Sequence, residues 1–220
     1  MIHTEYLLSF SSKKGSDAVR IIVLLLSLAL SSCSGPFKHV TFTPSEKRTY
    51  VDELEAFRNR KDMYFRSNVT SPLTQIQRST FTHLNYFRPN FDLIFRVKLL
   101  KEKTPESVGI QATGGETRPA VRIGRFDFEV GGKKASLFAY KMIGDNSNEL
   151  FVPFTDNTCG ESSYIGGRYI DLKESRSGEY TLDFNYAYNP YCAYNHNFSC
   201  PIVPKENHLD ASVTAGEMRY

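Results

Sequence analysis

The first third of the folded region has apolar residues at helical spacing. Tyr50, Leu54 and Phe57 fall at positions i, i+4 and i+7, which places them on one face of a helix. Ser45 precedes this run and is a residue type that commonly caps helix N-termini. The pattern therefore predicts a helix over about residues 46–65.

A second, shorter helix is predicted directly afterwards. Ser71 and Pro72 stand together, and this pair is typical of an N-cap followed by the first helical position. We expect this helix to end near Thr82.

From residue 90 onward the pattern changes to a period of two, which is typical of half-buried strands. Residues 92–99 alternate in this way, and residues 120–130 and 133–142 flank Gly131-Gly132. Two adjacent glycines supply the positive φ angles that a tight hairpin turn needs. Four further strands are predicted at residues 149–154, 168–172, 180–185 and 211–216.

These elements predict one α+β, β-rich domain. The order of elements shows no βαβ alternation and no internal repeat, so we expect N-terminal helices packed on an antiparallel meander or barrel-like sheet. A long irregular loop is expected near the C-terminus, because Pro and Asn residues interrupt regular structure there.

The segment before the domain resembles a leader peptide. Residues 21–30 form an uncharged apolar run that follows Lys13, Lys14 and Arg20. The run is too short to span a bilayer but has the length of a signal-peptide core. It ends in Leu-Ser-Ser followed by Cys33, which resembles the lipobox of bacterial lipoproteins. A plain secretory peptide or a short buried helix are the alternatives.

This interpretation predicts the chain's organisation and location. Residues 1–32 would be the signal peptide, residues 33–44 a tether and residues 45–220 the domain. Acylated Cys33 would anchor the protein to a membrane of the bacterial cell envelope, on the periplasmic or outer-membrane side. Because the first 18 residues carry acidic Glu5 and Asp17, we expect that translation starts later than Met1, near Val19.

Charge and composition narrow the function classes. The 27 Lys and Arg residues against 24 Asp and Glu give a net charge of +3, and no block of like charges occurs. Nucleic-acid binding is therefore not expected. No motif for a nucleotide, metal or other cofactor is found, so none is predicted.

The segment 182–209 is rich in Asn, Tyr, Cys, His and Pro. A long irregular loop inside a compact domain commonly serves a function, and its aromatic residues disfavour disorder. It is predicted to line a binding or catalytic site. The alternative is an Ω-type loop that Asn side chains hold in place.

Two cysteines of this loop, Cys192 and Cys200, are eight residues apart. In an exported protein they could form a disulfide. A metal pair that includes His196 is the less favoured alternative, because zinc sites prefer closer cysteines and four ligands.

A second charged segment lies at residues 153–171. It places Arg168 near Asp156, Glu161 and Asp171. Arg168 could hold an anionic ligand, with Glu161 or Asp156 acting as acid or base. An ion pair with turn capping is the alternative.

Over residues 55–218 the sequence resembles the DUF1684 family of bacterial and archaeal proteins. The residues that carry this resemblance are Asn59-Arg60-Lys61-Asp62, Ser71-Pro72-Leu73, Pro153-Phe154-Thr155-Asp156, Gly167-Arg168-Tyr169, Asp183-Phe184-Asn185, Tyr188-Asn189-Pro190, Cys192-Ala193-Tyr194, Cys200-Pro201 and Glu206-Asn207-His208-Leu209. The family has no known function. The resemblance implies that the segments 153–171 and 182–209 converge on one site.

We therefore expect a lipid-anchored domain that binds a small molecule in a polar pocket lined by the Asn/Tyr/Cys loop. The predicted ligand-binding residues are Tyr164, Arg168, Asn185, Tyr188, Asn189, Tyr194 and Asn207. One alternative is a hydrolase with Glu161 or Glu206 as general base. Another is a structural or partner-binding envelope lipoprotein.

Overall fold

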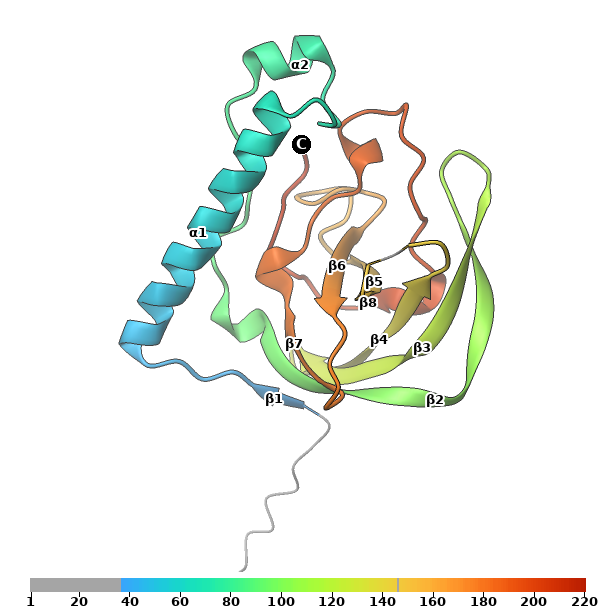
Figure 1. The fold of residues 1–220 in the computed structure, drawn as a ribbon. Coiled ribbons are helices and arrows are strands. Elements are labelled where there is room, and N and C mark those ends of the chain that lie inside the picture. Colours follow the sequence, from blue (N-terminus) through green and yellow to red (C-terminus); the bar gives the residue numbers. More distant parts are fainter. Residues whose placement is uncertain (1–36, 146) are drawn as a thin grey trace, which may run out of the picture. The chain divides into compact units, whose positions relative to one another are not determined.

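The structure is a computed structural model, which describes residues 37–145 and 147–220 (Figure 1). The predicted leader, Cys33 and the first part of the tether lie outside these residues. None of the described helices is long and apolar enough to cross a membrane.

The predicted long helix is confirmed as α1 (Pro44–Ser67). The predicted N-cap was wrong by two residues, because Thr43 caps the helix. The Thr43 hydroxyl accepts from the backbone of Glu46, whose carboxylate accepts from the backbone N–H of Thr43 at 2.7 Å. Pro44 takes the first helical position, where its missing N–H and fixed φ cost nothing.

The short helix is also present, but later than predicted, as α2 (Gln75–Thr80). Its capping box consists of Thr74 and Gln77. Ser71 is not its N-cap, since its hydroxyl donates to the carbonyl of Phe65 at 2.6 Å. Ser71 thus fixes the turn that follows α1.

An antiparallel sheet forms the body of the domain (Figure 1). Its strands are β1 (Phe37–His39), β2 (Ile94–Gln111), β3 (Thr117–Val130), β4 (Lys133–Met142), β5 (Glu149–Asp156), β6 (Arg168–Lys173), β7 (Glu179–Asp183) and β8 (His208–Leu209). The order is β1-β2-β3-β4-β5-β6, with β7 also paired to β2 and β8 added in parallel to β5. The short 3-10 turns are η1 (Phe91–Leu93), η2 (Phe184–Tyr186), η3 (Tyr191–Ala193) and η4 (Lys205–Asn207).

The predicted hairpin is confirmed in β3 and β4. Gly131 and Gly132 have φ angles of 59° and 74°, as a type I′ turn requires. Along β3 the residues Phe126, Phe128 and Val130 are buried and those between them are more exposed, so the hairpin has one apolar face.

The sheet curls around this apolar face. The long strand β2 pairs with β1 and β7 through its first residues and with β3 further along, with a register shift between Lys101 and Glu106. Phe95, Phe128 and Phe184 pack inside the curl with ring centroids 5.2 to 6.1 Å apart. The α+β, β-rich class predicted from the sequence is therefore confirmed.

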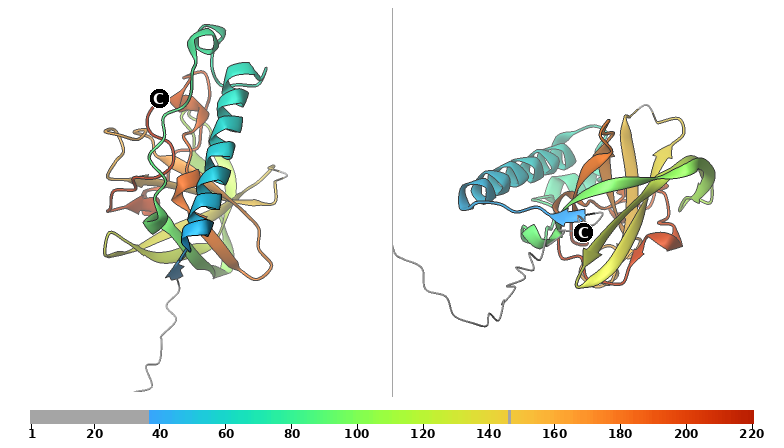
Figure 2. Two further views of the ribbon diagram at one scale, coloured as in Figure 1. Left: turned by 90° about the vertical axis from the view of Figure 1, so that its left-hand side faces the viewer. Right: turned by 90° about the horizontal axis from the view of Figure 1, so that it is seen from below.

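Helix α1 lies along one side of the curled sheet (Figure 2). The hydroxyl of Tyr50 donates to Asp183 at 2.7 Å. Further along α1, Phe57 meets Tyr186 and Phe65 meets Tyr194 at centroid distances of 4.9 and 4.8 Å. The helix is thus fixed at both ends.

The strand predicted at residues 211–216 is wrong. This segment is irregular, and the carbonyls of Val213 and Ala215 accept hydrogen bonds from the Arg168 guanidinium at 2.8 and 2.5 Å. A buried side chain thus satisfies backbone groups that a neighbouring strand would otherwise pair.

Candidate functional site

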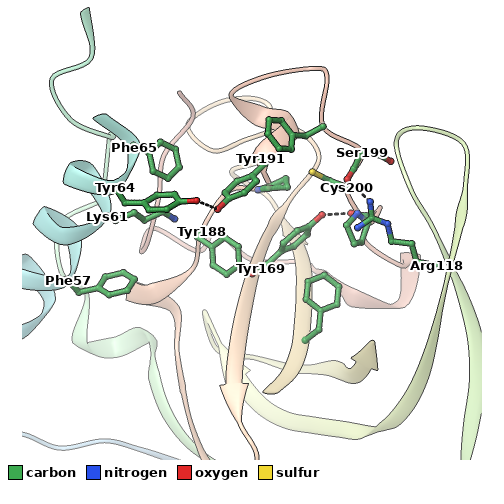
Figure 3. A pocket seen from close by; sticks show the side chains of 14 residues that line it. Phe57, Lys61, Tyr64, Phe65, Arg118, Tyr169, Tyr188, Tyr191, Ser199 and Cys200 are labelled. Carbon is green, nitrogen blue, oxygen red and sulfur yellow. Dashed lines mark hydrogen bonds between the residues drawn. The ribbon is translucent and has the colours of Figure 1, made fainter. Parts of the chain in front are cut away.

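A cavity of about 530 Å³ lies between α1, the strands β3, β5 and β6, and the loop 188–201 (Figure 3). Its volume is that of a small-molecule site. Eight of its fourteen lining residues are aromatic, namely Phe57, Tyr64, Phe65, Phe151, Tyr169, Tyr188, Tyr191 and Phe198. We call it the aromatic cavity.

The helix contributes one wall of the aromatic cavity. Phe57, Lys61, Tyr64 and Phe65 follow the i, i+4, i+7, i+8 spacing of one helix face. The Lys61 ammonium lies 4.9 Å from the centre of the Tyr188 ring, in the range of a cation–π contact. Lys61 thereby joins the helix wall to the loop wall.

Glu217 fixes the position of Lys61. Its side chain is 1% exposed, and its Oε1 lies 2.5 Å from Lys61 Nζ. Its Oε2 accepts from the hydroxyl of Tyr194 at 2.5 Å and from the backbone N–H of Asn189 at 2.8 Å. Glu217 does not line the aromatic cavity, so it pairs with Lys61 from behind the cavity wall.

Arg118 of β3 lies at the other end of the cavity (Figure 3). Its Nη2 donates to the carbonyl of Ser199 at 2.7 Å and to Glu116 at 3.0 Å. The Arg118 and Glu116 side chains are 38% and 45% exposed. An ion pair this open to solvent is weak, so a ligand anion could compete for the guanidinium.

The tyrosine hydroxyls of the cavity are engaged with the protein. Tyr188 donates to Asp171 at 2.5 Å, and Tyr169 donates to the carbonyl of Pro201. Burial raises the pKa of both phenols above the ordinary value, so they remain neutral. What these residues offer a ligand is therefore the ring rather than the hydroxyl group.

The structure brings only some of the predicted ligand-binding residues to a cavity. Tyr188 lines the aromatic cavity. Tyr164 lines a second cavity of about 380 Å³, together with Cys192 and His196. Cys200 lines the aromatic cavity, so the loop does face both spaces.

Arg168 is located away from both cavities, in contrast to the ligand-binding role predicted for it. Its side chain and that of Asp156 are 0% exposed, and their ion pair is 3.0 Å long. The same guanidinium holds the carbonyls of Val213 and Ala215. In this geometry Arg168 joins the start of β6 to the segment 213–217.

Three predicted asparagines also bond to the protein itself. Asn207 donates to the carbonyls of Phe138 and Pro153, and Asn185 donates to the carbonyl of Asn90. Asn189 donates to the carbonyl of Met218, while Tyr194 is bound to Glu217. Through these contacts the asparagine side chains bond the loop to neighbouring segments of the chain.

The two glutamates of the hydrolase alternative lie on the surface. Glu161 is exposed in the turn after β5, and Glu206 is exposed and accepts from the hydroxyl of Tyr140 at 3.1 Å. Neither lines the aromatic cavity. Within residues 37–145 and 147–220, no three His, Cys, Asp or Glu side chains are placed to bind one metal ion.

Two parts of the site, the helix wall and Arg118, were not predicted from the sequence. The signal for the helix wall was present, since Lys61 is four residues after Phe57 and therefore on its face. No sequence pattern pointed to Arg118, because only the folding of the hairpin brings this residue next to the loop 188–201.

We compared the chain with known protein families to determine its family. A family model described as "Protein of unknown function (DUF1684)" matches residues 79–218. The chain belongs to the DUF1684 family. No curated protein matches it.

A solved structure is similar to this DUF1684 chain. It is the solution NMR structure of an uncharacterised protein from Haloarcula marismortui, with 37% sequence identity and a TM-score of 0.63. The match covers 80% of this chain and 97% of that one. Family membership thus supports the fold and leaves the activity to be inferred from the site.

Proposed function

We propose that this DUF1684 domain binds a small ring-bearing molecule with an anionic group in the aromatic cavity. The observation that carries the proposal is the set of eight aromatic residues around a space of about 530 Å³. Rings of this kind bind planar apolar groups by stacking and edge contacts.

The charges at the two ends orient the ligand. Separating Lys61 from Glu217 would leave a buried carboxylate without its cation, which typically costs several kcal/mol. Arg118 is instead paired at the surface with Glu116, and such pairs contribute at most about 1 kcal/mol. The ring therefore lies among the aromatic side chains, and the anionic group points to Arg118.

Two fluorescent probes with the same rings test this orientation. Anilinonaphthalene sulfonate carries an anion, and phenylnaphthylamine lacks it. We expect both to bind the full chain, with Arg118→Gln weakening the sulfonate about tenfold, the lower end of a charge-assisted hydrogen bond. The affinity for phenylnaphthylamine is expected to change less than about twofold.

Arg125→Gln is the matched control. Arg125 is on the same strand, exposed, and paired with Asp127 at 2.9 Å, but it does not line the cavity. We expect it to change neither affinity. Equal losses for both probes in Arg118→Gln, or no binding of either probe to the unchanged chain, would refute the proposal and favour the structural or partner-binding alternative.

We also propose that the domain is exported and anchored to a membrane of the cell envelope through acylated Cys33. The support is the apolar run of residues 21–30 followed by Leu-Ser-Ser-Cys. Metabolic labelling with an alkyne fatty acid tests this in a bacterial host. Labelling that persists in Cys33→Ser, or its absence in the unchanged chain, would contradict the anchor.

A further inference from the structure

Cys192 and Cys200 lie against each other in the structure. The backbone N–H of Cys192 donates to the sulfur of Cys200 at 3.2 Å. Both residues are buried, at 5% and 6% exposure, and both are free thiols. The sulfur of Cys200 thus lies directly against the backbone of Cys192, and no bond joins the two cysteines.

Other contacts hold their loop in this conformation. Thr113 and Cys200 exchange two hydrogen bonds, of 2.9 and 3.0 Å. Gln77 donates to the carbonyl of Tyr194, and Asn195 donates to the carbonyl of Pro72, each at 3.0 Å. Because these contacts do not involve the sulfurs, the loop can keep its shape whether the cysteines are joined or not.

Each of the two cysteines lines a cavity. Cys200 lines the aromatic cavity, and Cys192 lines the second cavity of about 380 Å³ with Tyr164 and His196. A small reagent can therefore reach the pair in the folded protein.

The surroundings make Cys192 the more reactive of the two. A hydrogen bond with Cys200 lowers the pKa of Cys192 to about 6 and raises that of Cys200. The hydroxyl of Tyr164 lies 3.8 Å from the Cys192 sulfur and remains protonated, since burial raises its pKa to about 12. The third cysteine differs, because burial raises the pKa of Cys159.

We propose that Cys192 and Cys200 are a reversible dithiol–disulfide site that exchanges with small disulfides entering through the second cavity. The Cys192 thiolate attacks a disulfide RSSR, forms a mixed disulfide and releases RS⁻. The sulfur of Cys200 then attacks the Cys192 sulfur and releases the second RS⁻, which takes the Cys200 proton. The two cysteines are oxidised and RSSR is reduced, and excess thiol reverses both steps.

Glutathione redox buffers test the exchange on the full chain carrying Cys33→Ser. This variant has three cysteines, Cys159, Cys192 and Cys200. Samples are equilibrated at several ratios of reduced to oxidised glutathione and then alkylated with N-ethylmaleimide, and intact mass gives the number of adducts. We expect three adducts on the reduced chain and one on the oxidised chain, with Cys192 and Cys200 changing together. Peptide mapping should find the 192–200 disulfide, and circular dichroism should be unchanged.

Single variants separate the two roles. Cys200→Ser is expected to trap glutathione on Cys192, because no second thiol can release it. At neutral pH, Cys192 should alkylate at least about tenfold faster than Cys159 in the native chain, because far more of it is thiolate. The additional variant Cys159→Ser should leave the redox transition of the pair unchanged.

Three results would overturn the proposal. One is that all three thiols stay reduced at every glutathione ratio in the folded chain. Another is a 192–200 disulfide that dithiothreitol reduces only in denaturant, which would make it a structural bond. The last is alkylation of Cys192 no faster than that of Cys159. These readouts do not depend on the probes for the aromatic cavity, so the two proposals fail separately.

Discussion

Replacing Arg168 with Met distinguishes a scaffold role from a ligand-binding role. The side chain of Arg168 is fully buried and bonds Asp156 at 3.0 Å and the carbonyl of Val213 at 2.8 Å. Met has a similar length without charge or donors. The substitution therefore leaves a buried carboxylate without its cation and buried carbonyls without their donor.

The size of the effect follows from these losses. Breaking a buried ion pair by removing one partner costs about 3–5 kcal/mol. Asp156 keeps hydrogen bonds from the backbone of Thr158 and Val213, which moderates the loss. The unpaired carbonyls of Val213 and Ala215 add to it, since each unmade buried hydrogen bond costs about 1–3 kcal/mol. We expect a total loss of at least about 4 kcal/mol in the free energy of unfolding.

Urea unfolding followed by circular dichroism measures this loss. Arg125→Met is the control, because Arg125 is exposed and its pair with Asp127 is at the surface; we expect a change below about 1 kcal/mol. Adding Asp156→Asn to Arg168→Met should recover part of the loss by removing the buried charge. If Arg168→Met unfolds like the unchanged chain but no longer binds either naphthalene probe, the scaffold role is refuted and Arg168 binds ligand.

Three further predictions concern the walls of the aromatic cavity and the pH dependence of folding. Glu217→Gln should lower the free energy of unfolding by about 2 kcal/mol in urea, because Lys61 loses its anion; an unchanged midpoint would contradict the role of this pair. Tyr188→Phe should leave the affinity for phenylnaphthylamine within about twofold, whereas Tyr188→Ala should weaken it about tenfold. The reason is that the hydroxyl is bound to Asp171 and only the ring meets the ligand. Equal losses of affinity in a fluorescence titration of the two variants would refute this. Burial raises the pKa of Asp183 above the ordinary value of 3.8. Between the pKa of the unfolded chain and that of the folded chain, the folded state therefore keeps a proton that the unfolded chain has lost. The contribution of Asp183 to the free energy of unfolding falls as pH rises through this range. Asp183→Asn should remove that part of the slope in urea unfolding measured across this range, and an unaltered slope would show that other groups cause it.

Much of the fold could be predicted because its patterns are local. The hairpin of β3 and β4 needs only alternation and two glycines, and the helix α1 needs only its apolar spacing. The cap of α1 was misplaced because Thr43 and Ser45 are both good caps, and only the partner Glu46 and Pro44 decide between them. The absence of a strand at residues 211–216 depends on Arg168, which is more than forty residues away in the sequence.

The candidate site was predicted in part. The unusual composition of segment 182–209 directed attention to a loop that faces the aromatic cavity through Tyr188 and Cys200. Its asparagines suggested a polar pocket, but Asn185 and Asn207 bond to the backbone instead. An Asn amide both donates and accepts, so composition alone does not distinguish binding of a ligand from support of an irregular chain. The structure shows a cavity with mainly aromatic walls.

The C-terminal segment 213–217 explains why the two walls of the cavity stay together. Its carbonyls are held by Arg168 of the sheet, and its Glu217 binds Lys61 of the helix and Tyr194 of the loop. Sheet, helix and loop are therefore tied to one irregular stretch through two buried charges. Patterns of hydrophobic and polar residues detect regular elements, and this stretch is not one. The geometry of the aromatic cavity thus depends on contacts between residues that are far apart in the sequence, and for that reason the sequence led to the loop but not to the site.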